Sequence, residues 1–129
     1  MNKISILRLI AFNFLVLIFL QSCSKDEVSV SGSRKVKYEI TGDFSGSIDV
    51  VAVVGNGSFE AIEVKKLPWI YEFTADKTLT QLSITASGNS GKTGQKATLK
   101  VYVGDKEVSS GSGTASNGFI FMNLKAYVF

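Results

Sequence analysis

The chain of 129 residues has no histidine and only one cysteine, one proline and one tryptophan. Histidine titrates near neutral pH and is the commonest metal ligand, so its absence removes the usual catalytic base and metal ligand. A single cysteine excludes an internal disulfide and a zinc–thiolate cluster. The carboxylates show no characteristic acid–base spacing; those weighed as candidates are Asp43, Asp49, Glu60, Glu63 and Glu72. We therefore expect no enzymatic activity, no metal and no cofactor.

The only long apolar run lies near the N-terminus. It covers residues 9–20, follows Lys3 and Arg8, and is interrupted only by Asn13. A membrane-spanning helix needs about 20 apolar residues. A basic start, a shorter apolar stretch and a small residue before the cut are typical of a cleaved secretory signal. We therefore predict a signal peptide over residues 1–22, with an uncleaved anchor helix as the alternative.

The end of this run, Leu20-Gln21-Ser22-Cys23, resembles the bacterial lipobox. In signals of that kind the leader is removed before the cysteine, and its thiol and new N-terminus are acylated. The resemblance therefore implies that Cys23 is lipidated. A single acyl chain holds a protein to a membrane only marginally, whereas two or more hold it firmly. We expect the mature protein to be bound to a membrane through the acyl chains on Cys23.

The residues that follow the cysteine are Ser24, Lys25, Asp26 and Glu27. A serine beside the cysteine resembles the signals that send lipoproteins to the outer membrane. The Lys-Asp-Glu cluster resembles the short charged tag with which Bacteroidetes lipoproteins are exported to the cell surface; the alternative is a solvated tether. We expect a protein that is lipid-anchored in the outer membrane and faces the periplasm or the exterior.

Removal of the signal leaves 107 residues and lowers the net charge from +3 to +1, because Lys3 and Arg8 leave with it. A nearly neutral chain has no strong electrostatic attraction for nucleic acid. About 100 residues make one domain. We therefore predict a flexible tether over residues 23–34, one folded domain over residues 35–129, and no nucleic-acid partner.

From Lys35 onward, apolar and polar residues alternate with the period of two that is typical of β-strands, and no stretch shows a helical period. Gly55-Asn56-Gly57 favours a tight hairpin, and Pro68 interrupts strand pairing. The expected strands cover residues 36–40, 48–54, 58–65, 69–74, 81–87, 99–103, 107–110 and 118–129. Residues 111–117 are rich in glycine and serine, and we expect them to be soft. The sequence predicts an all-β fold, namely an antiparallel immunoglobulin-like β-sandwich of about seven strands.

Three segments of this domain have alternative interpretations. We expect Trp69 to lie in the core, with a ligand platform as the alternative. Residues 118–129 are apolar on both faces, so we expect a central strand; on an edge strand the outer face would be an apolar partner site. Gly91-Lys92-Thr93 lacks the earlier glycine and the following helix of a phosphate-binding loop, so we expect a hairpin loop.

Several landmarks occur in a distinctive order along the domain. They are Val36-Lys37-Tyr38-Glu39-Ile40-Thr41-Gly42, Leu67-Pro68-Trp69, Leu82-Ser83-Ile84-Thr85-Ala86, Leu99-Lys100-Val101-Tyr102-Val103 and Gly104-Asp105-Lys106. Over nearly all of residues 35–129 the chain resembles the MmpS-type proteins, small extracytoplasmic β-sandwich domains that are accessories of RND-type lipid and siderophore exporters. It departs from them in two respects. The mycobacterial members have an N-terminal membrane helix in place of the lipobox, and a cysteine pair where this chain has apolar residues such as Leu99.

The resemblance implies a non-catalytic role. We expect a cell-envelope lipoprotein that supports an RND-type transport complex through contacts with an envelope protein, most simply a component of the transporter. The alternative is a surface-exposed module that binds a glycan or a host protein.

Overall fold

The computed structural model describes residues 32–129, which form one compact unit. This part of the chain contains no helix. Its ten strands are β1 (Lys35–Gly42), β2 (Ser47–Val53), β3 (Phe59–Val64), β4 (Trp69–Thr74), β5 (Gln81–Leu82), β6 (Ile84–Asn89), β7 (Lys96–Val103), β8 (Lys106–Thr114), β9 (Ile120–Asn123) and β10 (Tyr127–Val128).

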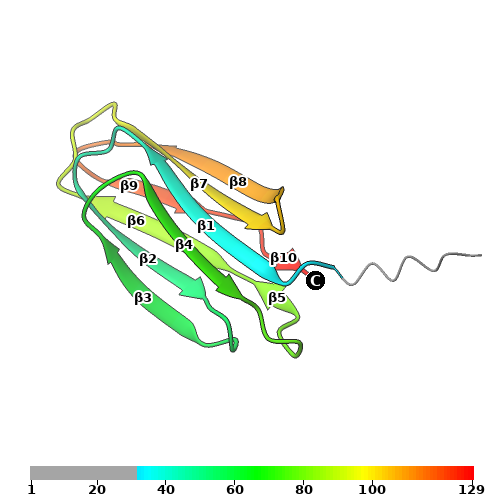
Figure 1. Ribbon diagram of the computed structural model, residues 1–129. Helices are drawn as coiled ribbons and strands as arrows, with labels where there is room; N and C mark the ends of the chain where they lie inside the picture. Colours follow the sequence, from blue (N-terminus) through cyan, green and yellow to red (C-terminus); the bar gives the residue numbers. More distant parts are fainter. Residues whose placement is uncertain (1–31) are drawn as a thin grey trace, which may run out of the picture. The chain divides into compact units, whose positions relative to one another are not determined.

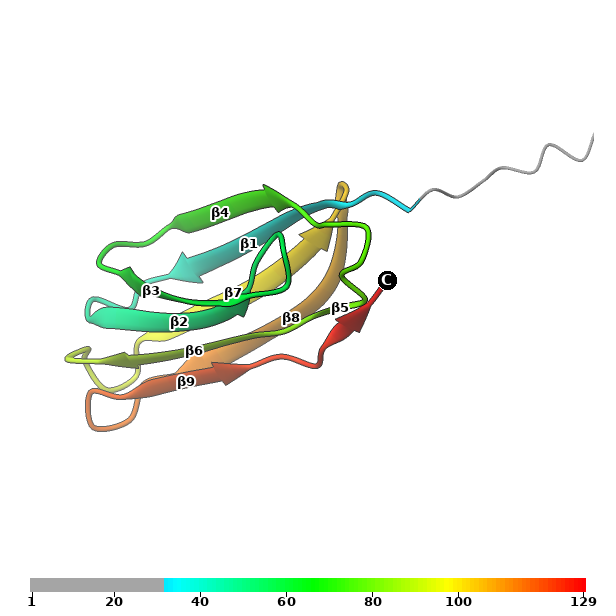
Figure 2. The same ribbon diagram turned by 90° about the horizontal axis from the view of Figure 1, so that it is seen from below.

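Eight of these strands form two four-stranded antiparallel sheets that pack face to face (Figures 1 and 2). Sheet A has the order β4-β1-β7-β8, and sheet B has the order β3-β2-β6-β9. The short strands β5 and β10 pair separately near the C-terminus. The antiparallel sandwich that the sequence predicts is therefore confirmed. In immunoglobulin constant domains the first strand lies at a sheet edge, whereas here β1 lies between β4 and β7.

The loops gather at two ends of the sandwich (Figure 1). We call the end at which β1 begins the proximal end; its loops cover residues 54–58, 75–80 and 104–105. The opposite end is the distal end, with loops over residues 43–46, 65–68, 90–95 and 115–119. The strands run alternately between these two ends because every pairing in both sheets is antiparallel.

The core lies between the two sheets and follows directly from the alternation in the sequence. In β1 and β7 every second residue is buried, and the residues between them face solvent. The largest fully buried side chains are Tyr38, Ile40, Ile48, Leu82, Ile84 and Leu99. No polar or charged residue of the described domain is buried. The domain is therefore held together by apolar burial and by hydrogen bonds between strands.

Two expectations about the C-terminal half are wrong. Residues 118–129 are not one central strand, because β9 pairs only with β6 at the edge of sheet B and the chain then leaves the sheet before β10. Residues 111–117 are not soft throughout, because residues 111–114 belong to the nine-residue strand β8. Glycine normally weakens a strand, but here its missing side chain makes room for a neighbouring strand.

That neighbour is β9, which closes one side of the sandwich against β8. A Cβ atom added to Gly113 would lie 2.8 Å from the carbonyl oxygen of Phe121 and 2.8 Å from the Ile120 side chain. A Cβ atom on Gly111 would lie 2.6 Å from Leu124. The glycines of β8 therefore let the edge of sheet B approach sheet A closely.

The opposite side, between β3 and β4, is filled by aromatic rings. Trp69, Tyr71 and Phe73 form what we call the aromatic ladder, with 6.0 Å between successive ring centroids. Phe73 also meets the buried Tyr38 edge to face at 5.4 Å. All three ladder residues pack against the core but remain half-buried. Trp69 thus contributes to the core without being enclosed by it.

Arg34 attaches the start of the domain to its C-terminus. Its guanidinium donates hydrogen bonds to the carbonyl oxygens of Asp76 at 2.6 Å and Leu79 at 2.9 Å, and lies 4.0 Å from the centroid of the Phe129 ring. Hydrogen bonds from a charged donor are stronger than neutral ones. The chain therefore enters the domain at a fixed point.

Candidate functional site

The site residues predicted from the sequence lie outside the described residues. They are the lipobox residues Leu20, Gln21 and Ser22, the lipidated Cys23, and the export tag Ser24, Lys25, Asp26 and Glu27. Lipidation and export thus remain predictions.

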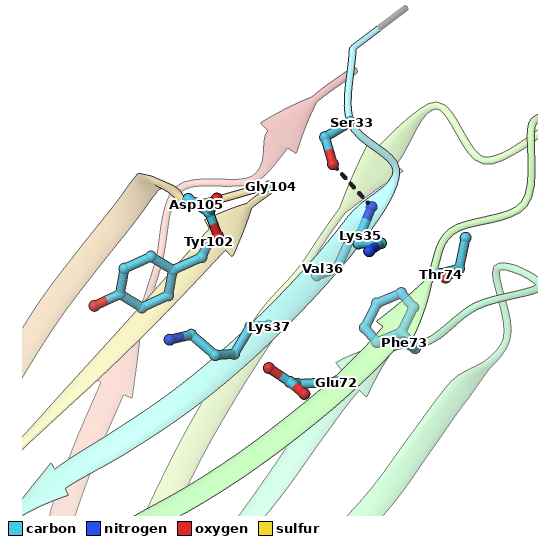
Figure 3. A pocket seen from close by; sticks show the side chains of 10 residues that line it. All are labelled: Ser33, Lys35, Val36, Lys37, Glu72, Phe73, Thr74, Tyr102, Gly104 and Asp105. Carbon is cyan, nitrogen blue, oxygen red and sulfur yellow. Dashed lines mark hydrogen bonds between the residues drawn. The ribbon is translucent and has the colours of Figure 1, made fainter.

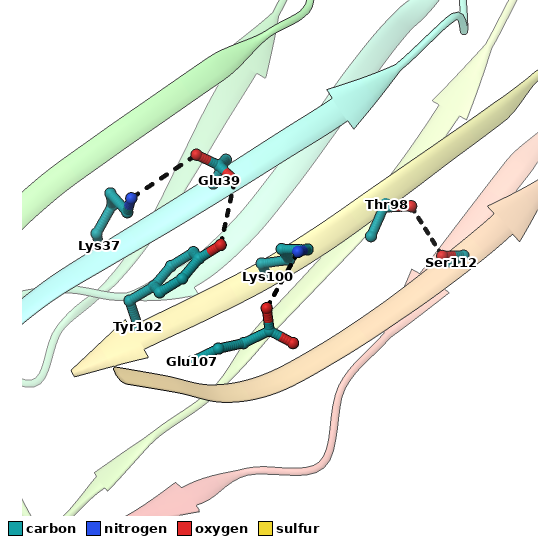
Figure 4. Close-up of polar contacts among 7 residues, drawn as sticks. All are labelled: Lys37, Glu39, Thr98, Lys100, Tyr102, Glu107 and Ser112. Atoms are coloured by element: carbon teal, nitrogen blue, oxygen red, sulfur yellow. Dashed lines mark hydrogen bonds and ion pairs between the residues drawn. The ribbon is translucent and has the colours of Figure 1, made fainter. Parts of the chain in front are cut away.

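The outer face of sheet A is polar, and many of its charges are paired within the face (Figure 4). Lys37 lies 3.7 Å from the Glu39 carboxylate and 4.1 Å from the centroid of the Tyr102 ring. Lys100 forms an ion pair with Glu107 at 3.0 Å. This contact raises the pKa of Lys100 and lowers the pKa of Glu107, because a hydrogen bond between charged groups favours both charged forms.

A hollow of about 960 Å³ lies on this face near the proximal end (Figure 3). It is bordered by Lys35, Lys37, Glu72, Tyr102 and Asp105. Lys37 is already engaged by Glu39 and by the Tyr102 ring. We interpret this hollow as a solvated, charge-balanced surface between strands.

The carboxylates weighed as catalytic candidates are distributed over separate structures. Asp43 accepts a hydrogen bond from the Lys96 backbone N–H at 2.6 Å, and Glu60 accepts one from the Tyr71 hydroxyl at 3.4 Å. Asp49 and Glu63 are directly opposite each other on β2 and β3 and are exposed on the outer face of sheet B. Sequence reasoning missed this last pair because it did not assign the register between the two strands.

Residues 32–129 contain no group of three or more acidic or metal-ligating side chains that could hold a metal ion. No helix in this part of the chain is long and apolar enough to cross a membrane.

The distal end exposes two aromatic side chains close together in the chain. Phe119 is 67 % exposed at the end of the β8–β9 loop, and Phe121 is 64 % exposed on the outer face of β9. A hollow of about 560 Å³ lies beside them; it is lined by Ser87, Gly88, Asn89, Thr114, Ser116, Phe119, Ile120 and Phe121. We call Phe119, Phe121 and this hollow the distal aromatic site. It presents two apolar rings among small polar groups and has no charged residue in its lining.

Two other loops of the distal end are joined by hydrogen bonds centred on Gln95. The Gln95 Oε1 accepts from the backbone N–H of Ser45 at 3.1 Å, from the Ser45 hydroxyl at 3.0 Å and from the backbone N–H of Lys92 at 2.8 Å. Its Nε2 donates to the Asp43 carbonyl at 2.7 Å. One side chain therefore links the β1–β2 loop to the β6–β7 loop.

Further backbone hydrogen bonds connect the β6–β7 loop to the β8–β9 loop. Gly94 N–H donates to Ala115 O at 2.9 Å, and Gly91 N–H donates to Gly118 O at 3.1 Å. Asn117 N–H donates to the Thr93 hydroxyl at 3.1 Å. Asn117 and Gly118 both have positive φ, of 50° and 83°, and turn the chain immediately before Phe119. Phe119 is therefore presented by a loop that several hydrogen bonds hold in place, and Phe121 by the strand that follows it.

Part of this site could be predicted from the sequence and part could not. Phe119 and Phe121 belong to the segment whose edge-strand alternative predicted an apolar partner site, and the edge position is the one observed. The expectation that both residues lie in the core is wrong. No local signal indicated that Gln95 joins two loops, because Ser45 and Asp43 lie 50 and 52 positions away from it in the chain. The Gly91-Lys92-Thr93 segment is a loop as expected, but it joins the two sheets and does not form a hairpin.

Replacing Gln95 with alanine should loosen the distal loops while leaving the sheets intact. The change removes an acceptor shared by three donors, so we expect the free energy of unfolding to fall by about 1 kcal/mol. Amide hydrogen exchange should accelerate in residues 43–46 and 90–95 and stay unchanged in β1 and β7. Gln81→Ala, at an exposed position of β5, is the control. Equal exchange rates in both variants would contradict this role of Gln95.

Comparison of the chain with protein-family models, with curated proteins and with solved structures finds no match. The described domain is therefore classified by its fold alone. It is an all-β antiparallel sandwich with an exposed aromatic site at its distal end.

Proposed function

We propose that this protein is a non-catalytic lipoprotein of the cell envelope whose sandwich domain docks a protein partner through the distal aromatic site. The partner is an envelope protein, most simply a component of an RND-type transport complex, as the resemblance to MmpS-type proteins implies. The single observation that carries the docking role is the exposure of Phe119, on a hydrogen-bonded loop, and of Phe121, on the adjoining strand β9.

The energetics of binding favour such a site. A partner that covers two phenylalanine rings removes apolar surface from water. The loops are already ordered, so binding does not have to supply the entropy of ordering them. Aromatic anchors surrounded by small polar residues resemble the composition of antibody paratopes, which bind proteins. Single exposed apolar residues are common on any surface, whereas here two exposed phenylalanines lie two positions apart beside a hydrogen-bonded loop.

The position of the site agrees with the proposed anchor. The chain enters the domain at the proximal end, beside Arg34, and the aromatic site lies at the other end. A protein attached to a membrane through Cys23 would therefore present this site on the end of the domain farthest from its tether. The alternative function, binding of a glycan, draws support from the hydroxyl and amide groups of Ser87, Asn89, Thr114 and Ser116 in the hollow.

The experiment is photo-cross-linking in cells that make the full acylated chain. A photoreactive residue replaces Phe119 or Phe121, and the control position is Phe59, which is 69 % exposed but lies on β3 at the proximal end. We expect one envelope protein to be captured from positions 119 and 121 and not from position 59. Phe119→Ser combined with Phe121→Ser should reduce co-purification of that protein by about tenfold or more, as expected for the loss of two aromatic anchors.

Two further outcomes test the parts of the proposal separately. Cys23→Ala should release the protein from the membrane fraction; if this variant stays in that fraction, the lipid anchor is contradicted. If positions 119 and 121 capture no protein but the purified chain binds glycans, and the double serine variant does not, the glycan alternative replaces the protein-docking role.

A further inference from the structure

The side of the sandwich between β3 and β4 has open strand edges, unlike the opposite side. The edges of β8 and β9 approach each other, as the position of Gly113 beneath the Phe121 carbonyl shows. The strands β3 and β4 each pair with one neighbour only. An open edge presents unpaired backbone groups that can accept another strand.

The hydrogen-bond pattern identifies which groups of β4 are unpaired. Ala75 N–H donates to the Arg34 carbonyl at 2.8 Å, and these residues continue the register in which Phe73 pairs with Val36. Hydrogen-bonded and non-bonded pairs alternate along an antiparallel ladder. The odd-numbered residues of β4 therefore make their backbone hydrogen bonds to β1. The even-numbered residues Ile70, Glu72 and Thr74 direct their backbone N–H and C=O groups to the free edge.

The β2–β3 loop covers one end of this edge. Asp76 N–H donates to the Gly55 carbonyl at 2.7 Å, and a Cβ atom on Gly55 would lie 3.2 Å from the Thr74 carbonyl oxygen. At the other end Pro68 has no N–H to offer. The accessible part of the edge is therefore centred on Ile70 and Glu72, which together present two N–H and two C=O groups.

The side chains around this edge indicate what it would bind. Ile70 is 54 % exposed on the outer face, and the half-buried aromatic ladder lies on the inner face. Two carboxylates flank it. Glu72 is exposed beside Ile70, and Glu60 of β3 accepts the Tyr71 hydroxyl hydrogen bond. Burial and the nearby Glu60 charge raise the pKa of Tyr71, so the phenol stays protonated as a donor.

We propose that the free edge of β4 binds a short extended segment of another protein by strand addition. The segment carries a lysine or arginine opposite Glu72 and apolar residues toward the aromatic ladder. The backbone groups of Ile70 and Glu72 supply the hydrogen bonds, and the two carboxylates select a basic segment. Strand addition to an exposed sheet edge is an established mode of peptide recognition, in which alternate side chains give specificity. This site is separate from the distal aromatic site.

A second copy of this chain fits the same edge poorly. Two copies of β4 could pair antiparallel, with one residue at the centre of a symmetric register. Pairing about Glu72, with that residue at the centre, places two Glu72 carboxylates directly opposite each other, which is destabilising. Pairing about Ile70 places Glu72 opposite Pro68, which cannot donate. Pairing about Tyr71 places each Glu72 opposite Ile70, which offers the carboxylate no basic partner. A basic segment meets none of these obstacles.

The β1 strand provides a rational probe, because β4 already accepts it on its other edge. A capped peptide with the sequence of residues 35–42 places a lysine opposite Glu72 in the register that β1 itself uses, Lys37 opposite Glu72. We would titrate it into the isotope-labelled full chain in detergent micelles and measure amide hydrogen exchange. We expect several-fold slower exchange at Ile70 and Glu72 and no change at Phe59, Ala61 and Glu63.

Reversing the charge first on the peptide and then on the protein tests the specificity. The peptide variant leaves the protein unchanged, so its result does not depend on whether a protein variant folds. A peptide with Lys37→Glu should bind the wild-type chain about fivefold more weakly, the size expected for one cross-strand charge pair. Glu72→Lys, at an exposed edge position, should reverse this preference. The inference is overturned if the peptide protects β3 and not β4, or if affinity is indifferent to both charge changes. It is also overturned if Ile70 and Glu72 become protected with rising protein concentration alone, which would identify a second copy as the occupant.

Discussion

Replacing Tyr38 with alanine should lower the free energy of unfolding by about 4 kcal/mol, the range found for removal of a large buried aromatic side chain. Tyr38 lies in the middle of the central strand β1 and is 0 % exposed. Its ring meets Phe73 edge to face, and its hydroxyl crosses the core to donate a 2.6 Å hydrogen bond to the Val53 carbonyl of β2. Alanine would leave a cavity and remove this link between the two sheets.

Tyr38→Phe separates the hydroxyl from the ring. Because the Val53 carbonyl would lose a buried donor, we expect a cost of about 1–2 kcal/mol at pH 7. Burial, with a smaller contribution from Tyr71, raises the pKa of Tyr38 above its ordinary value. A phenol in the unfolded chain loses its proton near pH 10, while the folded one keeps it. The stabilisation from this group is thus complete below pH 10 and is lost as the pH rises beyond it.

Denaturant unfolding of the three proteins at pH 7 and between pH 9 and 11 provides the measurement. Above pH 10 the wild-type stability should fall more steeply than that of Tyr38→Phe, which lacks the ionisable group. Parallel curves for the two proteins would contradict the assignment. A loss below about 1 kcal/mol for Tyr38→Ala would show that the core does not depend on this ring.

Gly113→Val should destabilise the domain by about 3 kcal/mol, the upper part of the range for overpacking. The new Cβ atom would collide with the backbone carbonyl of Phe121 and with the Ile120 side chain. A backbone carbonyl cannot rotate away as a flexible side chain can, so β9 would have to separate from β8. The change should also displace Phe121 and weaken binding at the distal aromatic site.

Ser112→Val is the matched control for this change. Ser112 is the preceding residue of β8, and its exposed side chain lies on the outer face of sheet A, where it shares a hydrogen bond with Thr98. Valine is favoured in strands, so we expect a change of less than about 0.5 kcal/mol, typical of surface substitutions. Thermal unfolding of both variants is the measurement. Similar melting temperatures would contradict the close approach of β9 to β8.

The two proposed docking surfaces divide the roles of the domain in a way that experiment can separate. The distal aromatic site uses side chains of the β8–β9 loop and of β9, so its loss should follow from substitution of Phe119 and Phe121. The β4 edge uses backbone groups, so it should respond to the charge at Glu72 and be indifferent to those phenylalanines. An envelope accessory that holds one partner at its far end and a strand of another at its side would act as a bridge between them.

The alternation of apolar and polar residues determined most of the fold by itself. A period of two places every second side chain of β1 and β7 on the buried face, whatever their neighbours are. The Gly55-Asn56-Gly57 turn fixed the β2–β3 hairpin, because residues in such a turn must accept unusual φ values, and Gly57 has a φ of 87°. These signals are local, so they can be read without knowledge of the rest of the chain.

The tertiary structure alone decided which strands lie at the edges. Residues 118–129 are apolar on both faces, a pattern typical of a central strand, yet β9 is an edge strand that exposes Phe121. Gly111 and Gly113 belong to a segment that the sequence suggests is soft, but they are strand residues that make room for β9. The physical reason is the same in both cases. Periodicity depends on the residue and its immediate neighbours, whereas edge position and close approach depend on pairings between residues far apart in the chain.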